Sequence, residues 1–232
     1  QIPLGFKHFG DCDKTNTKFL IMEQFSGDLI DFATKINPTP LQISSIGKQL
    51  LDGFQVIHGK GFLFIDVKPG NFMLSELPSS SSSDITVKFI DFGCAEKWRS
   101  YTGDTRPFKQ RQIAGTPEFL SLDAHNGNEP DRKDDIESLF WVLISLSTNA
   151  QLPWRVATSD IQCQTMKKAC NIHELCLSCG VPELSECVEH IRQLKYGEVP
   201  NYEHYHAILD RLAKRKSSKA ATNTNTNTDG KV

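Results

Sequence analysis

The sequence predicts a mainly helical α+β fold, in which a few short strands surround two polar loops. Helices are indicated by the segment from Leu41 to His58, which has one apolar face, and by the segment from Ile136 to Leu146, which is apolar almost all round. Strands are indicated by short apolar runs at 62–65 and 87–90, each followed by a carboxylate. Since apolar runs are buried on folding, the polar residues beside them are expected at the mouth of a core.

The amino-terminal region predicts a pair of strands. Residues 18–23 (KFLIME) read as a buried strand, which follows a turn-rich segment at 11–17. Residues 1–9 are the expected antiparallel partner, although Pro3 and Gly5 disfavour regular pairing.

Two helices are expected next. The first begins near Asp28. The second carries apolar residues at helical spacing and ends at Gly59 and Gly61. The members of its apolar face are Ile43, Ile46, Leu50, Phe54 and Ile57.

Two polar loops organise the middle of the chain. The segment 62–74 (FLFIDVKPGNFML) places Asp66, Lys68 and Asn71 between apolar runs, and the segment 87–93 (VKFIDFG) repeats the pattern with Asp91. Glycine at position 93 is expected to let the backbone turn so that Asp91 faces the site. Pro78 and the serine run 79–83 predict a flexible hairpin tip between the two loops.

The second half of the chain is expected to be helical after one long loop. Residues 93–119 predict that loop, at the surface. The acidic segment 131–135 opens a helix that is buried on every side and that Pro153 and Trp154 end. Residues 161–195 mix helix and loop, and residues 202–214 form a last helix with Ala207, Ile208 and Leu212 in the core. The asparagine–threonine repeat within 217–232 predicts disorder.

Composition excludes several classes of protein. The net charge of −2 provides no general attraction to nucleic acid or to a membrane surface, and no apolar run reaches the roughly 20 residues of a spanning helix. No signal peptide is visible. Seven cysteines, an odd number, favour a reducing intracellular compartment, either nucleus or cytoplasm.

The two polar loops resemble the catalytic loop (H-R-D-x-K-x-x-N) and the metal-binding loop (D-F-G) of protein kinases. The segments 114–127 (AGTPEFLSLDAHNG), 132–139 (RKDDIESL) and 152–154 (LPW) are similar to the casein kinase 1 superfamily. The form S-L-D-A-H-N-G looks most like the vaccinia-related kinase branch of that superfamily. The A-P-E motif of most protein kinases is absent from the superfamily and from this sequence. The motifs extend from about Ile2 to Leu212, and as an ordered set they are highly specific.

The resemblance implies a role for each polar residue. Asp66 would accept the proton of the attacking hydroxyl, Lys68 would stabilise the γ-phosphate of ATP, and Asn71 and Asp91 would hold Mg²⁺. Thr116 would bond to the catalytic aspartate and lysine. Asp135 would hold the backbone of the catalytic loop.

The resemblance also implies an adenine site and a division of the chain. Met22, Glu23, Phe25, Met73 and Ile90 would surround the adenine, with 23–25 as the hinge. Residues 1–27 would be the last strands of a small lobe and the hinge, residues 28–215 the large lobe, and residues 216–232 a disordered tail.

The sequence departs from the kinase pattern at two places. Phe64 and Ile65 replace His-Arg, so Phe64 is expected to pack beside Phe92, and Ile65 cannot pair with a phosphorylated activation loop. The 232 residues contain no glycine-rich loop, no lysine of the V-A-I-K type and no glutamate to pair with it. We therefore expect the sequence, which starts at Gln1, to be a fragment that lacks most of the small lobe and that is inactive alone.

Two readings of function remain open at the level of sequence. The first is a serine/threonine protein kinase that phosphorylates protein hydroxyls with ATP and Mg²⁺. The alternative is a pseudokinase, which keeps the fold as a binding or scaffold module. Protein substrates are the expected partners, and nucleic acid and membranes are not.

Two smaller motifs have plain structural alternatives. The C-x-x-C pair Cys176 and Cys179, with Cys170 and Cys187 nearby, would need a closed set of four ligands to hold zinc, and ordinary reduced thiols are the expectation. The basic cluster 214–216 could be a nuclear address, but basic residues also favour a helix carboxyl end.

Overall fold

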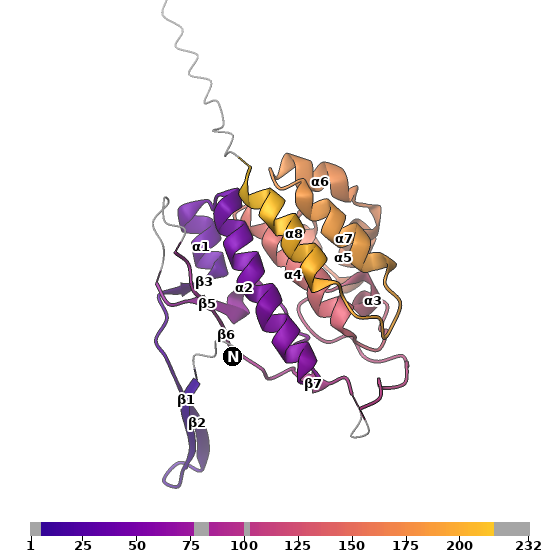
Figure 1. Ribbon diagram of the computed structural model, residues 1–232. Coiled ribbons are helices and arrows are strands. Elements are labelled where there is room, and N and C mark those ends of the chain that lie inside the picture. Colours follow the sequence, from indigo (N-terminus) through magenta and orange to yellow (C-terminus); the bar gives the residue numbers. More distant parts are fainter. Residues whose placement is uncertain (1–5, 77–83, 100–102, 216–232) are drawn as a thin grey trace, which may run out of the picture.

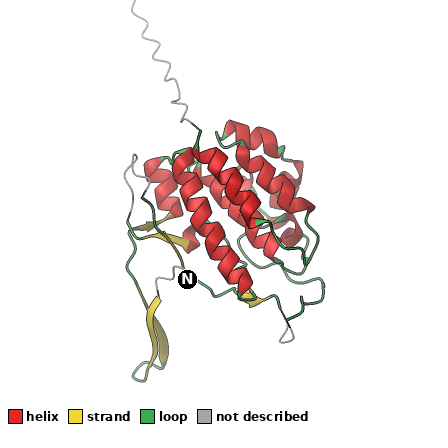
Figure 2. Cartoon of the chain, in the orientation of Figure 1, coloured by secondary structure: helices red, strands yellow, loops and turns green. Residues whose placement is uncertain are grey.

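The computed structural model describes residues 6–76, 84–99 and 103–215, and it is a bundle of helices with short strands along one side (Figure 1). Figure 2 shows how far helix outweighs strand in it. The predicted hairpin tip at 78–83 and the predicted tail at 217–232 lie outside the described residues. In the described part, no helix is both long enough and apolar enough to span a lipid bilayer.

The central helix, α4 (Arg132–Leu146), is buried along its whole length, as its sequence predicts. Helices α2 (Pro40–Gly59) and α7 (Glu183–Gln193) pack against it, and α8 (Tyr202–Ala213) packs against both α2 and α7. The remaining helices are α1 (Leu29–Ile36), α3 (Leu122–His125), α5 (Asp160–Ala169) and α6 (Ile172–Ser178), and two 3₁₀ turns span Pro69–Asn71 and Pro153–Val156.

Local sequence explains why α2 begins where it does. Thr39 Oγ1 accepts from the Gln42 amide at 3.3 Å, and Gln42 Oε1 accepts from the Thr39 amide at 2.9 Å, which completes a capping box. Pro40 is the first helical residue, where its missing N–H costs nothing. All five residues of the predicted apolar face are buried.

The strands form three small sheets. In one, β3 (Gly27–Asp28), β5 (Phe72–Leu74) and β6 (Val87–Phe89) pair in the antiparallel order β3-β5-β6. In the second, β4 (Phe62–Leu63) pairs with β7 (Glu96–Lys97). The third is a hairpin of β1 (Phe6–Cys12) and β2 (Thr17–Met22).

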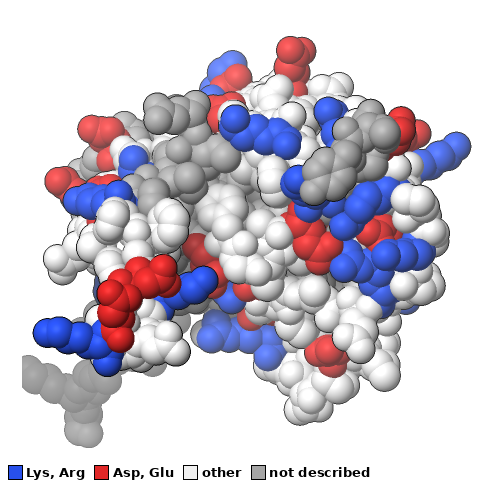
Figure 3. Space-filling model, turned by 90° about the horizontal axis from the view of Figure 1, so that it is seen from below, with Lys and Arg blue, Asp and Glu red and all other residues white. Residues whose placement is uncertain are grey.

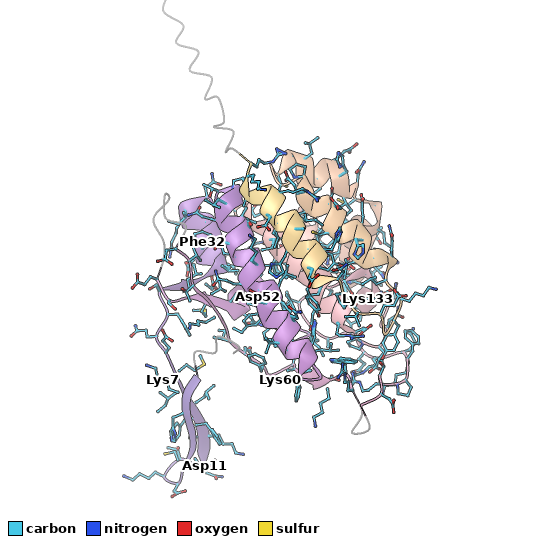
Figure 4. All side chains as sticks on the ribbon, in the orientation of Figure 1. Lys7, Asp11, Phe32, Asp52, Lys60 and Lys133 are labelled. Carbon is cyan, nitrogen blue, oxygen red and sulfur yellow. The ribbon has the colours of Figure 1, made fainter. Side chains whose placement is uncertain are left out.

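The hairpin corrects the expectation of a buried strand at 18–23. The strand and its antiparallel partner exist, but every residue of β2 is exposed, including Leu20 at 58%. The hairpin projects away from the helical body (Figure 1), and Lys7 and Asp11 lie on it in Figure 4. The apolar composition of β2 was read correctly as strand, but burial requires a packing partner, and no described element covers it.

Three further expectations need correction. Helix α4 ends at Leu146, well before Pro153, and Asn149 and Ala150 then adopt left-handed backbone conformations. The side chain of Ala207 is exposed, whereas Tyr205 and Leu209 of the same helix are buried. The long loop at 93–119 contains the short strand β7, which fixes part of it to β4.

Candidate active site

One buried carboxylate, that of Asp135, binds the backbone of the loop that follows β4. Asp135 of α4 accepts hydrogen bonds from the amides of Phe64 and Ile65, both at 2.8 Å, and Nε2 of His58 lies 2.9 Å from it. Ile65 has a φ of 71°, a left-handed conformation that β-branched residues rarely adopt. Asp135 therefore fixes a strained backbone directly before Asp66, and its contacts match the role that the resemblance implied.

Phenylalanine at position 64 fills a packing role. Its ring centre lies 5.0 Å from that of Phe92 in an edge-to-face arrangement, and it also packs with Phe54 and Phe72. The expected contact between Phe64 and Phe92 is therefore present, and it joins the two polar loops through apolar rings.

The carboxylate of Asp66, at the mouth of the core, is hydrogen-bonded by the side chains of Lys68 and Thr116. Lys68 Nζ lies 2.6 Å from Asp66 Oδ2, and Thr116 Oγ1 donates to Asp66 Oδ1 at 2.7 Å. Asn71 Nδ2 donates to the Asp66 carbonyl at 2.8 Å. Burial alone raises the pKa of Asp66, but the hydrogen bonds from Lys68 and Thr116 outweigh it, so the pKa lies below its ordinary value. The carboxylate is consequently ionised at neutral pH.

The predicted bond from Thr116 extends only to the aspartate: no bond between Thr116 and Lys68 is found in the described part of the chain. The structure thus brings Asp66, Lys68, Asn71 and Thr116 together, from two segments that lie 45 residues or more apart in the sequence.

Asp91 lies beside this group because β5 and β6 pair. The Ile90 amide donates to the Asn71 carbonyl at 3.0 Å, which places the end of β6 against the catalytic loop. Asp91 is exposed and accepts from the Gly93 amide at 3.1 Å.

The turn at 91–93 corrects the role given to glycine 93. The left-handed residue is Asp91 itself, with φ of 57°, and Gly93 has no such conformation. A β-carbon at position 93 would lie 3.0 Å from Asp91 Oδ1. Glycine at this position therefore leaves room for the carboxylate, and the backbone turn is made two residues earlier.

The candidate metal ligands are one carboxylate and one amide. Within residues 6–76, 84–99 and 103–215, no group of three or more His, Cys, Asp or Glu is placed to hold a metal ion. Asp91 and Asn71 offer oxygen atoms of the kind that Mg²⁺ prefers, and Mg²⁺ commonly takes its remaining ligands from phosphates and water. The pair fits a metal that arrives with a nucleotide.

The predicted adenine residues come from the end of the hairpin and the segment after it, from β5 and from the end of β6. Met73 is half-buried in β5, and Ile90 is half-buried directly after β6. The Ser26 amide donates to the Leu74 carbonyl at 3.1 Å, so the segment from Glu23 to Phe25 leads directly to β5. Met22, at the end of the hairpin, is 38% exposed. Their role in binding adenine stays a prediction.

Three residues that sequence reasoning missed, His58, Trp98 and Tyr202, complete the support of the loop that carries Asp66. Nδ1 of His58 lies 2.5 Å from the Tyr202 hydroxyl, so a buried chain of contacts runs from α8 through α2 to Asp135. Trp98 Nε1 donates to the His58 carbonyl at 3.0 Å. No local pattern could identify this set, because its members come from four distant segments.

The long loop at 93–119 is pinned by ion pairs. Arg111 binds Glu96 with both terminal nitrogens, at 2.7 and 3.0 Å, and Arg106 binds Glu96 at 3.1 Å and the buried Glu129 at 2.8 Å. The hydrogen bond from Arg111 lowers the pKa of Glu96 more than burial raises it. These ion pairs fix the loop, and none of them involves Ile65.

The cysteines are all free thiols, and five of them lie in or against the helical core. Cys176 and Cys187 are fully buried, and burial raises the pKa of both thiols. A raised pKa keeps a thiol protonated at neutral pH, so both side chains pack as ordinary reduced thiols in the core.

Comparison with known proteins agrees with this geometry. The protein kinase domain family matches residues 7–225. A probable serine/threonine-protein kinase of Dictyostelium discoideum is 30% identical over 87% of this chain and 41% of its own length. A probable casein kinase I homologue of Encephalitozoon cuniculi is 30% identical over 72% of this chain and 52% of its own length.

A third relative, casein kinase I homologue 2 of Schizosaccharomyces pombe, is 32% identical over 72% of this chain and 40% of its own length. The chain therefore spans about half, or less, of the length of the curated relatives that it matches.

Proposed function

Because the chain belongs to the protein kinase family, we propose that it is part of a serine/threonine protein kinase, which transfers the γ-phosphoryl group of ATP to protein hydroxyls. The observation that carries the proposal is the carboxylate of Asp66, which is ionised and held between Lys68 and Thr116. Placement in the casein kinase 1 superfamily, within its vaccinia-related branch, is part of the same proposal. The names of the relatives support the superfamily, and the segment 114–127 supports the branch.

Phosphoryl transfer depends on positioning and on charge neutralisation. Asp66 orients the attacking hydroxyl and accepts its proton as the new bond forms. Lys68, already 2.6 Å from Asp66, offers positive charge where the transferred group becomes more negative. Thr116 keeps Oδ1 of Asp66 in one orientation, so that Oδ2 and the lysine define the reacting edge.

ATP and Mg²⁺ are the cofactors that this reaction uses, with the magnesium neutralising phosphate charge. Asp91 and Asn71 would hold the metal through oxygen atoms. The amide of Asn71 is oriented for this because its nitrogen donates to the carbonyl of Asp66, which leaves Oδ1 as its ligand atom. Met22, Glu23, Phe25, Met73 and Ile90 would contact the adenine.

A specific observation favours a second candidate, a pseudokinase that binds partners without turnover. The 232 residues contain no glycine-rich loop and no lysine of the V-A-I-K type, and Ile65 replaces arginine. We propose that the chain acts as a kinase within a longer polypeptide, which supplies a cover for the phosphates, and that residues 28–215 are the large lobe of that kinase. The chain keeps all four residues that the reaction needs, namely Asp66, Lys68, Asn71 and Asp91. This favours an active kinase rather than a pseudokinase.

The remaining expectations are proposals of the same kind. The partners are protein substrates with serine or threonine acceptors. Basic and acidic side chains are intermixed on the face seen in Figure 3, which favours protein over nucleic acid as the partner. The seven free cysteines support an intracellular location, in nucleus or cytoplasm.

The test is phosphoryl transfer from labelled ATP to a peptide library with serine and threonine acceptors, using the full-length protein. Asp66→Asn should keep nucleotide binding and lower kcat by about 10²–10⁴-fold, the range for a positioned base. Asp91→Asn should weaken binding of the Mg²⁺–nucleotide complex itself. Glu76→Gln, at an exposed position of the same region, is the matched control and should behave as wild type.

Transfer at wild-type rates by both aspartate variants would refute these roles. Tight nucleotide binding with no transfer by the wild-type protein would establish the pseudokinase instead.

A further inference from the structure

Helix α5 carries a lysine that is fully buried, directly beside one that is exposed. The side chain of Lys167 has no exposed surface, and its Nζ lies 2.9 Å from the Pro117 carbonyl, 2.7 Å from the Leu120 carbonyl and 3.3 Å from His125 Nε2. Among the described residues, no carboxylate lies within ion-pair distance of it. A lysine buried without an acidic partner is uncommon, because desolvation penalises the charged form.

The three neighbours of Lys167 fit the charged ammonium. An ammonium group has three N–H donors, and here it meets three acceptors, whereas a neutral amine has only two donors. His125 can be the third acceptor because burial, and next the charge of Lys167, lower its pKa to about 4, so the imidazole is neutral at neutral pH.

Burial lowers the pKa of Lys167 itself to about 7. More distant charged or titratable groups surround it: Cys163, Glu137 and Glu118 raise its pKa, and Arg192 lowers it further. No group in this set pairs with it directly, so its charge state follows the pH near neutrality.

The two carbonyls that Lys167 holds belong to a turn next to the catalytic aspartate. The amides of Phe119 and Leu120 donate to the Thr116 carbonyl at 2.9 and 3.2 Å, and this closes the turn on Thr116. Thr116 Oγ1 in turn donates to Asp66 at 2.7 Å. A single path of hydrogen bonds therefore runs from Lys167 through the turn to Asp66.

We propose that Lys167 is a positioning residue, whose charged ammonium holds the turn at 117–120 so that Thr116 stays on Asp66. When Lys167 loses its proton, one of the three acceptors loses its donor and the turn loosens. The consequence for phosphoryl transfer rests on the proposed function, but the consequence for the turn does not.

Hydrogen exchange tests the turn directly and needs no catalytic activity. In the wild-type protein, the amides of Phe119 and Leu120 should lose protection by about fivefold to tenfold as the pH rises through about 7, after correction for the intrinsic exchange rate. Lys167→Met should exchange rapidly at both ends of this range and show no step. Lys168→Met, which changes the exposed neighbour, is the matched control and should retain the wild-type step.

Two outcomes would overturn the inference. One is a Lys167→Met protein that keeps wild-type protection of Phe119 and Leu120 below pH 7. The other is a wild-type protein whose corrected exchange has no step between pH 6 and pH 9. If the Lys167→Met protein does not fold, the pH dependence of exchange in the wild-type protein still tests the inference.

Kinetic measurements on the full-length protein then separate this inference from the proposed function. Lys167→Met should lower kcat and leave KM for ATP within about twofold, because the turn contacts Asp66 and no predicted adenine residue. An exchange step in a wild-type protein that transfers no phosphate would support the turn and refute the kinase. Unchanged kcat in an active Lys167→Met enzyme would refute the positioning role.

Discussion

Ile65 shows how one residue can be kept in an unfavourable conformation. A left-handed backbone costs a β-branched residue about 1–2 kcal/mol, and Ile65 has φ of 71°. Its amide is held by Asp135 at 2.8 Å, and its side chain is buried against Leu63 and Trp98. The surrounding contacts thus determine the conformation, and they fix the direction in which the next residue, Asp66, leaves the loop.

Asp135 should accordingly be one of the most sensitive residues in the chain. Asp135→Asn replaces one acceptor oxygen by an N–H donor among three buried donors, and it should lower the free energy of unfolding by about 3–5 kcal/mol. The matched control is Asp134→Asn, where the wild-type carboxyl accepts from Ser121 Oγ and the Asp131 amide. It should cost under about 2 kcal/mol in urea unfolding at pH 7. Equal losses for the two variants would contradict the assignment of Asp135 as the anchor of the loop.

The carboxyl group of Asp134 also predicts that the stability of the protein depends on pH. Burial raises the pKa of Asp134 to about 7, above the ordinary value of 3.8. Between these values the folded state binds more protons than the unfolded state, so this group lowers the stability of the wild type as the pH rises from about 4 to 7. Stability of Asp134→Asn relative to wild type should therefore improve over that range. Urea unfolding at pH 4.5 and pH 7.5 measures it, and a constant difference would contradict the raised pKa.

At the scale of elements, close approach between α2 and its neighbours depends on glycine. A β-carbon at Gly53 would lie 2.4 Å from the ring of Phe89 in β6, and one at Gly47 would lie 2.8 Å from Leu143 in α4. These contacts bring α2 near both the central helix and the strand that leads to Asp91. The helix therefore positions, through packing, the loop that carries Asp91.

Substitution at two glycines of α2 tests this packing. Gly53→Ala should displace the Phe89 ring and lower the free energy of unfolding by about 1–3 kcal/mol, the usual cost of overpacking. Gly59→Ala meets no atom within 4 Å. It should be neutral or stabilise by up to about 1 kcal/mol, because alanine favours helix. Denaturant unfolding of both variants gives the comparison, and a stabilised Gly53→Ala would show that α2 and β6 are not in close contact.

At the scale of the whole molecule, the residues that the structure describes line only one side of the predicted nucleotide site. Met73 lies in β5 and Ile90 follows β6, and these two strands pack against helices α1 and α2. The hairpin that ends at Met22 projects from the helical body (Figure 1). An apolar groove of about 350 Å³ is lined by Ile57, Phe62 and Phe92, among others. The residues described here leave both the groove and the apolar side chains of β2 in contact with solvent.

Thermal unfolding with and without Mg²⁺–ATP follows from this arrangement. A ligand stabilises the folded state according to its concentration relative to Kd. The 232-residue chain, which offers one face and no phosphate cover, should show a rise in Tm below about 2 °C at millimolar nucleotide. A longer form that includes a glycine-rich loop should show a clearly larger rise. Equal shifts in the two proteins would show that the present residues are a complete nucleotide site.

Periodicity identified α2 and the buried α4, and the residue pattern identified both polar loops. The contact between Phe64 and Phe92 came from the resemblance to kinases. These features could be predicted because each depends on residues close together in the sequence, or on a motif whose residue types and spacing are characteristic. The hydrogen bond from Thr116 to Asp66 also came from motif resemblance, because both residues belong to segments with strong patterns.

Only the tertiary structure decided the rest. The exposure of β2 could not be read from its apolar side chains, because burial depends on what packs against a strand. The contacts of His58 with Tyr202, and of Lys167 with Pro117 and Leu120, join residues between 47 and 144 positions apart, where sequence spacing carries no signal. Lys167 and Lys168 are the same residue type in neighbouring positions. Their burial differs because one side of α5 faces the turn beside Asp66 and the other side faces water.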